Sequence, residues 1–292
     1  MKILLLGSGG REHALALKLK AGGADLTSAP GSDALATLGA RVDLDLENPA
    51  AVAAWCAEHR PDLVVPGPEV PLVAGVADAV RALGIPVFGH GAATAQLEGS
   101  KAFAKDFMQR HGLPCAASHT VTDLAAGEAL IRSWSHGYPI VLKADGLAAG
   151  KGVVLASTEA EALATYRDFL AGQFGDASRT VVLEAPLAGM ELSLHVLADV
   201  DADHAAYALL PACQDHKRIF DGDQGPNTGG MGAFGPLPFL RPEDIELMRT
   251  RLVEPTLRGL QADGLVARGV LFLGVMWTAR GPELLEYNVR FG

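Results

Sequence analysis

Cysteine is scarce in this sequence, and no segment is long and apolar enough to suggest a membrane span. The three cysteines, Cys56, Cys115 and Cys213, lie far apart and form no CxxC pair. A disulfide framework or a zinc site is therefore not expected, and the thiols are predicted to be reduced. The apolar run at Met1–Leu6 is too short for a signal peptide. We expect a soluble protein of the cytoplasm with no membrane segment.

Positive charge is also in short supply. Lys and Arg number 24 against 34 Asp and Glu, which gives a formal net charge of −10. A general nucleic-acid surface needs a basic face, and an excess of carboxylates over the whole chain repels phosphate. Nucleic acid is therefore not expected as a partner, and any phosphate ligand has to be held by locally placed groups.

Glycine is the residue present in excess. The 34 glycines among 292 residues exceed the roughly 20 that an average usage of about 7% would give. Much of this excess lies in a few clusters, and these are the segments in which the sequence suggests chemistry.

The first hundred residues alternate short apolar runs with helical patterns. Runs of Val, Ile and Leu that end in Gly or Pro turns are typical of parallel strands buried on both faces. The predicted strands are Ile3–Leu6, Leu63–Val65 and Ile85–Phe88, and the predicted helices are Glu12–Ala21 and Val70–Leu83. They indicate a doubly wound α/β domain over residues 1–97. The small and polar residues of Gly89–Ser100 predict a linker into a second unit.

The second unit, residues 98–292, is expected to have two lobes. A compact α+β small lobe is predicted over residues 118–189, and a larger lobe over residues 98–117 and 190–292. The T-x-x-E spacing of Thr158 and Glu161 predicts a capping box before a helix that runs to about Ala171. The other predicted elements are a helix at Lys101–His111, strands at Ile140–Lys143, Val153–Ala156, Thr180–Glu184 and Leu192–Ala198, a long loop at Gln214–Pro238, a helix at Pro242–Asp263, and strands at Val270–Met276 and Glu283–Asn288.

The first glycine cluster is Gly7-Ser8-Gly9-Gly10-Arg11-Glu12, at a predicted turn from strand to helix. Free backbone N–H groups and the helix dipole favour an anion there. The cluster is a poor dinucleotide fingerprint, because the third glycine of G-x-G-x-x-G is replaced by Glu12. A turn that needs glycine for backbone reasons alone remains the alternative.

The second cluster runs from Lys143 to Gly152 and joins two predicted strands. It is not a Walker A loop, because only three residues separate Gly146 from Gly150, and Gly152 stands where Ser or Thr is required. A glycine hairpin can instead close over a triphosphate, with Lys143 and Lys151 supplying positive charge. A simple glycine hairpin with solvated lysines is the alternative.

Two further segments complete the set. Gln214–Arg218 and Gly225–Gly232 form a long glycine-rich stretch, which is typical of a functional loop or of disorder. In the last predicted strand, period-two alternation places Glu286, Asn288 and Arg290 on one face. A carboxylate and an amide oxygen together suit Mg²⁺ bound with nucleotide phosphates, whereas an exposed polar sheet face is the alternative.

In this order the motifs resemble the ATP-grasp superfamily, and within it the phosphoribosylamine–glycine ligase family. The resemblance spans almost the whole chain, and the ordered set is far more specific than any single motif. It is carried by the stretches Gly7–Ala14, Gly67–Glu69, Gln96–Lys101, Lys143–Gly152, Gln214–Arg218, Gly225–Gly232 and Glu286–Gly292.

The resemblance implies an ATP-dependent ligation of glycine to 5-phosphoribosylamine through an acyl phosphate. It also implies ATP and Mg²⁺ (or Mn²⁺) as cofactors, no nucleic-acid or membrane partner, and a monomer or weak homodimer. By similarity, Lys101 and Lys143 contact ATP phosphates, the loop with Asp145, Gly146, Gly150, Lys151 and Gly152 covers them, Glu184, Ala185 and Leu187 meet adenine, Glu191 meets ribose, and Glu286 and Asn288 bind metal. The phosphoribosyl end is assigned to Gly9, Gly10, Arg11, Glu12, Gly67 and Glu69, and glycine with the acyl phosphate to Asp215, Lys217, Asn227 and Arg290.

The chain departs from the family pattern in two places. Many ATP-grasp enzymes take a further carboxylate ligand from the preceding strand, but Val270–Met276 contains none. The family also continues beyond Arg290-Phe291-Gly292 with Asp-Pro-Glu and another domain, so a C-terminal truncation is expected. Three other interpretations remain: a ligase for a different acid or amine, a nucleotide-binding module without turnover and, on the first glycine turn alone, a nicotinamide dehydrogenase.

Overall fold

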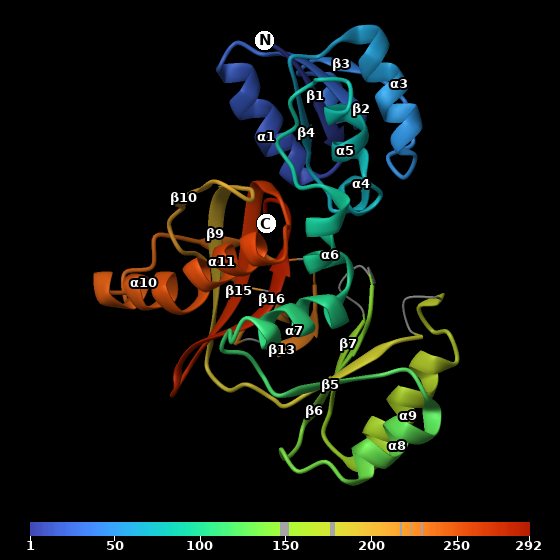
Figure 1. Cartoon of the computed structure of the whole chain (residues 1–292), viewed down its shortest axis with the longest axis vertical. Coiled ribbons are helices and arrows are strands. Elements are labelled where there is room, and N and C mark those ends of the chain that lie inside the picture. Colours follow the sequence, from blue (N-terminus) through green and yellow to red (C-terminus); the bar gives the residue numbers. More distant parts are fainter. Residues whose placement is uncertain (147–151, 176–178, 217, 223, 229) are drawn as a thin grey trace.

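The computed structural model describes residues 1–146, 152–175, 179–216, 218–222, 224–228 and 230–292, and at 226 and 227 the backbone only. Three parts are visible in Figure 1: an N-terminal domain at the top, a small lobe with α8 and α9 at the lower right, and a large lobe with α10 and α11 at the left. Helices α6 and α7 lie where the three parts meet.

The N-terminal domain is a parallel sheet with helices on both faces. Strands β1 (Lys2–Gly7), β2 (Asp25–Pro30), β3 (Ala40–Arg41) and β4 (Leu63–Pro66) lie in the order β3-β2-β1-β4. Alternate residues of β1 supply opposite faces, because Ile3 and Leu5 pack with α1 (Gly10–Ala21) and α2 (Asp33–Ala36), whereas Leu4 and Leu6 pack with α3 (Pro49–His59) and α5 (Val76–Arg81). The predicted doubly wound sheet is confirmed.

Two predicted elements of this domain are wrong in detail. The helix predicted at Val70–Leu83 is divided into α4 (Val70–Val73) and α5, because Gly75 between them has a φ of 92° that helical geometry does not allow. The strand predicted at Ile85–Phe88 is only a single bridge between Val87 and Val64. The carbonyl oxygens of Val87 and Gly89 accept hydrogen bonds from the side chain of Arg81 and not from a neighbouring strand.

The segment predicted as a linker, Gly89–Ser100, contains helix α6 (Ala92–Gly99). The carboxylate of Asp78 accepts a hydrogen bond of 2.7 Å from the N–H of Ala92 and so caps the helix from outside. Thr94 and Leu97 are buried, and the Thr94 hydroxyl donates to the carbonyl oxygen of Val266 at 2.7 Å. Helix α6 therefore packs closely against the large lobe.

The small lobe is a four-stranded antiparallel sheet covered on one face by two helices. Strands β5 (Ser118–Val121), β6 (Ile140–Ala144), β7 (Val153–Ala156) and β8 (Val181–Glu184) lie in the order β5-β8-β6-β7. Leu142, Ala144 and Leu183 pack against α8 (Leu124–Arg132) and α9 (Glu159–Leu170). Lys143 and Glu184 project from the opposite face, because successive side chains of a strand alternate.

The predicted cap of α9 is present with one change. The hydroxyl of Thr158 accepts a hydrogen bond from the N–H of Glu161 at 3.2 Å. The carboxylate of Glu161 accepts at 2.7 Å from the N–H of Ser157 and not from that of Thr158. The return bond of the capping box thus reaches one residue further back than predicted.

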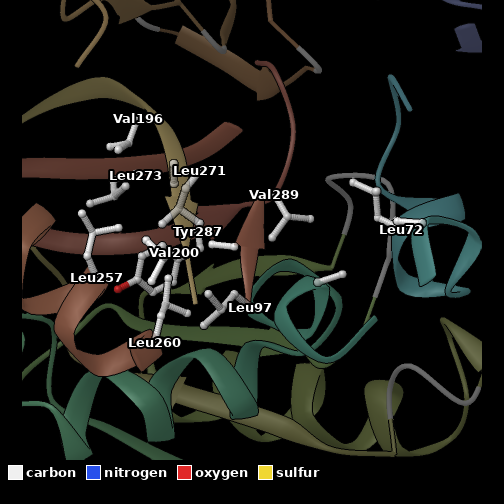
Figure 2. Packing of buried hydrophobic residues seen from close by; sticks show 14 of the residues in the cluster. Leu72, Leu97, Val196, Val200, Leu257, Leu260, Leu271, Leu273, Tyr287 and Val289 are labelled. Atoms are coloured by element: carbon white, nitrogen blue, oxygen red, sulfur yellow. The ribbon is translucent and has the colours of Figure 1, made fainter. Parts of the chain in front are cut away.

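The large lobe is an antiparallel sheet packed against helices. Strands β9 (Met190–Val200), β10 (Ala205–Leu209), β15 (Ala267–Thr278) and β16 (Gly281–Asn288) lie in the order β10-β9-β15-β16. The helix predicted at Pro242–Asp263 is α10 (Pro242–Met248), a π-helical turn at Arg249–Val253 and α11 (Glu254–Ala262). In Figure 2, Leu257 and Leu260 lie beside Val200, Leu271 and Tyr287 in the buried core of this lobe.

The loop predicted at Gln214–Pro238 contains short paired strands. Strand β11 (Gln214–Asp215) pairs with β14 (Ala233–Phe234), and β12 (Arg218–Phe220) pairs with β13 (Gln224–Asn227). Such short strands have no periodic pattern by which they could be recognised in the sequence. Within the described ranges, the structure contains no helix with the length and apolar character needed to cross a membrane.

Candidate functional site

Lys143 of β6 and Glu184 of β8 meet on the face of the small-lobe sheet that lies away from α8 and α9. Lys143 is opposite Val182 in the register, and Glu184 is opposite Val141, so the two side chains are diagonal neighbours. The Lys143 Nζ lies 3.0 Å from the Glu184 Oε1. Both side chains are nearly inaccessible to solvent.

Lys105 brings a second ammonium group to the same carboxylate. It lies on the buried face of α7 (Lys101–Arg110), with Ala104, Phe107 and Met108. Its Nζ is 3.1 Å from the Glu184 Oε2, and its side chain is 4% exposed. One buried carboxylate therefore lies between two buried lysines from different lobes.

The start of the glycine loop is bound to the N-terminus of α7. The hydroxyl of Ser100, the N-cap residue, donates to the Asp145 carboxylate at 3.0 and 3.1 Å, and the N–H of Ala102 donates to it at 3.1 Å. The Nζ of Lys101 donates to the carbonyl oxygen of Gly146 at 2.9 Å. A carboxylate at a helix N-terminus is electrostatically favourable, so Asp145 holds the loop base against the large lobe.

The rest of the predicted loop is described only in part. Gly150 and Lys151 lie outside the described residues. Gly152 is described, and its carbonyl oxygen accepts a hydrogen bond of 2.8 Å from the N–H of Ala144. The hairpin base between β6 and β7 is therefore closed by a backbone bond.

Burial and neighbouring charges together shift the pKa values of Lys101 and Lys105. Burial lowers the pKa of Lys101, and so does the nearby Lys143, whereas Glu286, Asp145 and Glu184 raise it. Burial likewise lowers the pKa of Lys105, against Glu184, which raises it. Because Glu286 raises the pKa of Lys101, the last strand of the large lobe lies close to the lysine cluster, which is formed by Lys101, Lys105 and Lys143.

Glu286 and Asn288 project from the same face of β16, opposite Gly274 and Phe272 of β15. A side chain at Gly274 would place its Cβ 3.2 Å from the Cγ of Glu286, so the glycine leaves room for that carboxylate. The Asn288 amide donates to the carbonyl oxygen of Tyr287 at 2.6 Å, so its own oxygen remains the acceptor atom. In the described part of the chain, no three His, Cys, Asp or Glu side chains form a metal-binding group by themselves.

β16 ends at Asn288, and Arg290 follows two residues later. Its guanidinium lies 3.2 Å from the Glu69 carboxylate and 2.9 Å from the Glu98 carboxylate. The N–H of Val289 also donates to Glu98, at 2.7 Å. Burial raises the pKa of Glu98 to about 7, against the opposing effects of Arg290 and of the Val289 N–H.

The glycine turn of the N-terminal domain borders a cavity of about 620 Å³. Arg11 and Glu12 line it, and Asp43, Asp45 and Glu47 lie on its rim. The Arg11 guanidinium donates to the carbonyl oxygen of Gly67 at 2.8 Å. Another hydrogen bond of 2.6 Å runs from the N–H of Gly9 to the Glu12 carboxylate.

Arg11 and Arg290 interact through space. The pKa of Arg11 is lowered by its burial and by Arg290, whereas Glu12, Glu69 and Glu98 raise it. The predicted phosphoribosyl residues of the first domain and the predicted acyl-phosphate residue Arg290 therefore occupy one neighbourhood.

Comparison with known proteins identifies the family to which this arrangement belongs. The family described as "Phosphoribosylglycinamide synthetase, N domain" matches residues 1–98, and "Phosphoribosylglycinamide synthetase, ATP-grasp (A) domain" matches residues 99–292. A phosphoribosylamine–glycine ligase from Agrobacterium fabrum is 51% identical over 294 residues, which cover 100% of this chain and 68% of that protein. The chain belongs to the phosphoribosylamine–glycine ligase family.

Other members of the ligase family support this assignment. The relative from Rhizobium meliloti is 50% identical over 296 residues, which cover 100% of this chain and 68% of that protein. The crystal structure of the Thermotoga maritima ligase matches with a TM-score of 0.84 and 32% identity, covering 100% of this chain and 69% of that one. The predicted ATP-grasp fold is thereby confirmed.

Three other residues were predicted for the ligase site, and the structure describes them only in part. Lys217 is outside the described residues, and of Asn227 only the backbone in β13 is described. Asp215 lies in β11, where it pairs with Ala233 of β14. None of the contacts described for Asp215 reaches the lysines, so its predicted part in binding glycine rests on the family resemblance.

The segment predicted to meet adenine follows β8. The N–H of Ala185 donates to the carbonyl oxygen of Ala117 at 2.9 Å, and Pro186 has no N–H. Leu187 is therefore the first residue after β8 whose N–H can bind a base. Glu191, the predicted ribose ligand, lies nearby on β9, at the position opposite Met276.

Two charged residues that contact predicted site residues, Lys105 and Glu98, were not predicted from the sequence. Lys105 lies four residues after Lys101, a spacing that places both on one helix face. That spacing could have indicated it. Glu98 lay within a recognised stretch but was given no role, because its partner Arg290 is distant in the sequence.

Proposed function

We infer that this ligase joins glycine to 5-phosphoribosylamine at the expense of ATP, giving glycinamide ribonucleotide, ADP and phosphate. The observation that carries the inference is the cluster of buried lysines at the meeting of the two lobes, in a chain whose whole length matches this family. Buried lysines supply the positive charge that is needed to hold nucleotide phosphates.

The reaction requires activation of a carboxylate. The glycine carboxylate attacks the γ-phosphate and releases ADP, which leaves a glycyl phosphate. The amine of phosphoribosylamine then attacks the acyl carbon, loses a proton and expels phosphate. No nucleophilic side chain is needed, so the protein has to align the reactants, neutralise phosphate charge and exclude water from the acyl phosphate.

Lys101 and Lys143 are the proposed phosphate ligands, and the loop of Asp145, Gly146, Gly150, Lys151 and Gly152 is the proposed cover. The contacts of Asp145 and Lys101 across the two lobes support this, because they place the loop base beside the lysines. The Glu184 carbonyl and the Leu187 N–H are proposed to meet adenine, and Glu191 the ribose hydroxyls.

Glu286 and Asn288 are the proposed ligands of Mg²⁺ (or Mn²⁺). A carboxylate oxygen and an amide oxygen on one strand face fit a hard cation that completes its coordination with phosphate oxygens and water. When bound, such a cation neutralises charge on the transferring phosphoryl group. The nearness of Glu286 to Lys101 supports this position.

The cavity beside the N-terminal turn is the proposed site of the phosphoribosyl group. Gly9, Gly10, Arg11, Glu12, Gly67 and Glu69 are proposed to form it. Arg290, together with Asp215, Lys217 and Asn227, is proposed to hold glycine and the acyl phosphate. A domain boundary near residue 97 and a monomeric or weakly dimeric state belong to the same proposal.

The test is ADP release in the presence of glycine, phosphoribosylamine and Mg²⁺. Turnover that requires both substrates supports the proposal. Equal turnover with another amino acid in place of glycine favours a different carboxylate–amine ligase, and nucleotide binding without turnover favours a binding module. A thermal shift with ATP and Mg²⁺ but none with NAD is expected, and a shift with NAD alone contradicts the proposal.

A further inference from the structure

We propose that Lys105 is a positioning residue for nucleotide phosphate. It shares Glu184 with Lys143, keeps the buried group net positive, and so allows Lys143 to exchange Glu184 for a phosphate. This inference rests on the proposed function, because it takes the lysine cluster as the ATP site.

The ion pairs define the charge of the group. In the part of the chain that the structure describes, Lys105 and Lys143 each form one ion pair, and both pairs are with Glu184. For these three side chains, two cations and one anion leave a net charge of +1. The three side chains are 4%, 10% and 3% exposed for Lys105, Lys143 and Glu184, so water offsets little of that charge.

A buried excess of positive charge is unfavourable until an anion arrives. Desolvation penalises the charged form of each lysine, and the pKa of Lys105 is lowered accordingly. An incoming phosphate relieves this penalty. The unbalanced positive charge of the free protein therefore favours nucleotide binding. A neutral Lys143–Glu184 pair would lack this attraction.

Lys105 also makes the departure of Lys143 feasible. If Lys143 turned to a phosphate in the absence of Lys105, Glu184 would be left as a buried carboxylate without a counter-ion, which is strongly unfavourable. With Lys105 in place, Glu184 keeps a cation at 3.1 Å. Lys105 thus supports phosphate binding without contacting phosphate.

The geometry of the cluster agrees with an exchangeable pair. The Nζ atoms of Lys105 and Lys143 lie 3.1 and 3.0 Å from different oxygens of the Glu184 carboxylate. Movement of Lys143 therefore leaves the contact of Lys105 in place.

The experiment compares ADP with adenosine, because only ADP carries phosphate. Binding to the full chain is measured by displacement of a fluorescent ADP analogue, with thermal melting as the check of folding. Lys105→Met is expected to weaken ADP about tenfold and adenosine less than twofold. Lys18→Met, an exposed lysine on α1, is the matched control and should bind both as the unsubstituted chain does.

The double variant Lys105→Met with Glu184→Gln decides the mechanism, because it removes one charge of each sign and restores the net +1. It is expected to bind ADP within about threefold of the unsubstituted chain. A tenfold loss of ADP in the folded double variant, or an equal loss of ADP and adenosine in Lys105→Met, overturns the proposal. If Lys105→Met does not fold, the double variant alone gives the answer. An unsubstituted chain that does not bind ADP at all refutes the proposed function itself.

Discussion

Arg290 links the large lobe to the N-terminal domain through Glu69, whose carboxylate lies 3.2 Å from the guanidinium. Glu69 directly precedes α4, at the carboxyl end of the parallel strand β4. Ligands of doubly wound sheets bind at this edge. The contact therefore places the end of β16, with its proposed metal ligands, beside the proposed site of the phosphoribosyl group.

Glu69→Gln is expected to weaken binding of glycinamide ribonucleotide several-fold and to leave ADP binding unchanged. The variant removes one of the two carboxylates that orient Arg290, while Glu98 remains at 2.9 Å. Calorimetric affinities for the two ligands measure this, with Glu243→Gln, at an exposed position on α10, as the control. Equal weakening of both ligands would show that the pair stabilises the fold and does not act on this substrate.

Asp145→Asn is expected to raise the KM for ATP and to lower the free energy of unfolding by about 1 kcal/mol. The carboxylate holds the loop base through Ser100 and the Ala102 N–H. Asp123→Ala is the matched control, since Asp123 caps α8 through the N–H of Ala126 at 2.8 Å and alanine removes that cap. The control should cost similar stability without changing KM, and equal KM values for the two variants would disprove the role of Asp145.

Glu286→Gln is expected to raise the Mg²⁺ concentration needed for half-maximal activity at least tenfold. The substitution keeps the shape but removes the charge that attracts a divalent cation. Asn288→Asp is the opposite change on the same strand face and should lower that concentration. An unchanged Mg²⁺ dependence in both variants would remove this pair from the metal site. ADP binding without Mg²⁺ provides the control.

Local patterns in the sequence predicted much of this fold. The strand at Val153–Ala156 and the helix beginning at Lys101 were located by short-range periodicity and capping, which depend on neighbouring residues. The predicted helix at Val70–Leu83 failed because a tertiary turn at Gly75 interrupts an otherwise helical pattern. The strand predicted at Ile85–Phe88 is reduced to one bridge with β4, made by the Pro86 carbonyl oxygen and the Phe88 N–H, and Arg81 takes the Val87 carbonyl oxygen.

The candidate site was predictable only where the family motif named a residue. Lys101 and Lys143 could be proposed in this way, and the structure brings both near Glu184. The pairing of Lys105 with Glu184 could not be predicted, because residues of different lobes meet only through the tertiary fold. The contact of Glu98 with Val289 joins residues 191 positions apart, and no local pattern encodes it.

The side chains of His90 and Glu98 are buried at the two ends of α6, and they make the free energy of unfolding change with pH in opposite directions. Burial lowers the pKa of His90 from 6.5 to about 4, although its ring nitrogen contacts the carbonyl oxygen of Val270 at 2.8 Å. The unfolded chain therefore binds the extra proton between these values, and the stability from His90 is lost as the pH falls from about 6.5 to 4. For Glu98, with a pKa raised from 4.5 to about 7, the folded chain binds the extra proton, and stability falls as the pH rises from 4.5 to 7.

The two contributions oppose each other between pH 4.5 and 6.5, so single variants are needed to reveal them. Glu98→Gln removes the carboxyl group whose ionisation lowers the stability of the folded protein. Compared with this variant, the unsubstituted chain is expected to lose up to about 3 kcal/mol of unfolding free energy between pH 4.5 and 7.5. Urea unfolding at intervals across that range measures the difference. His90→Asn serves as the control of opposite sign, and parallel curves for Glu98→Gln and the unsubstituted chain would show that Glu98 ionises normally beside Arg290.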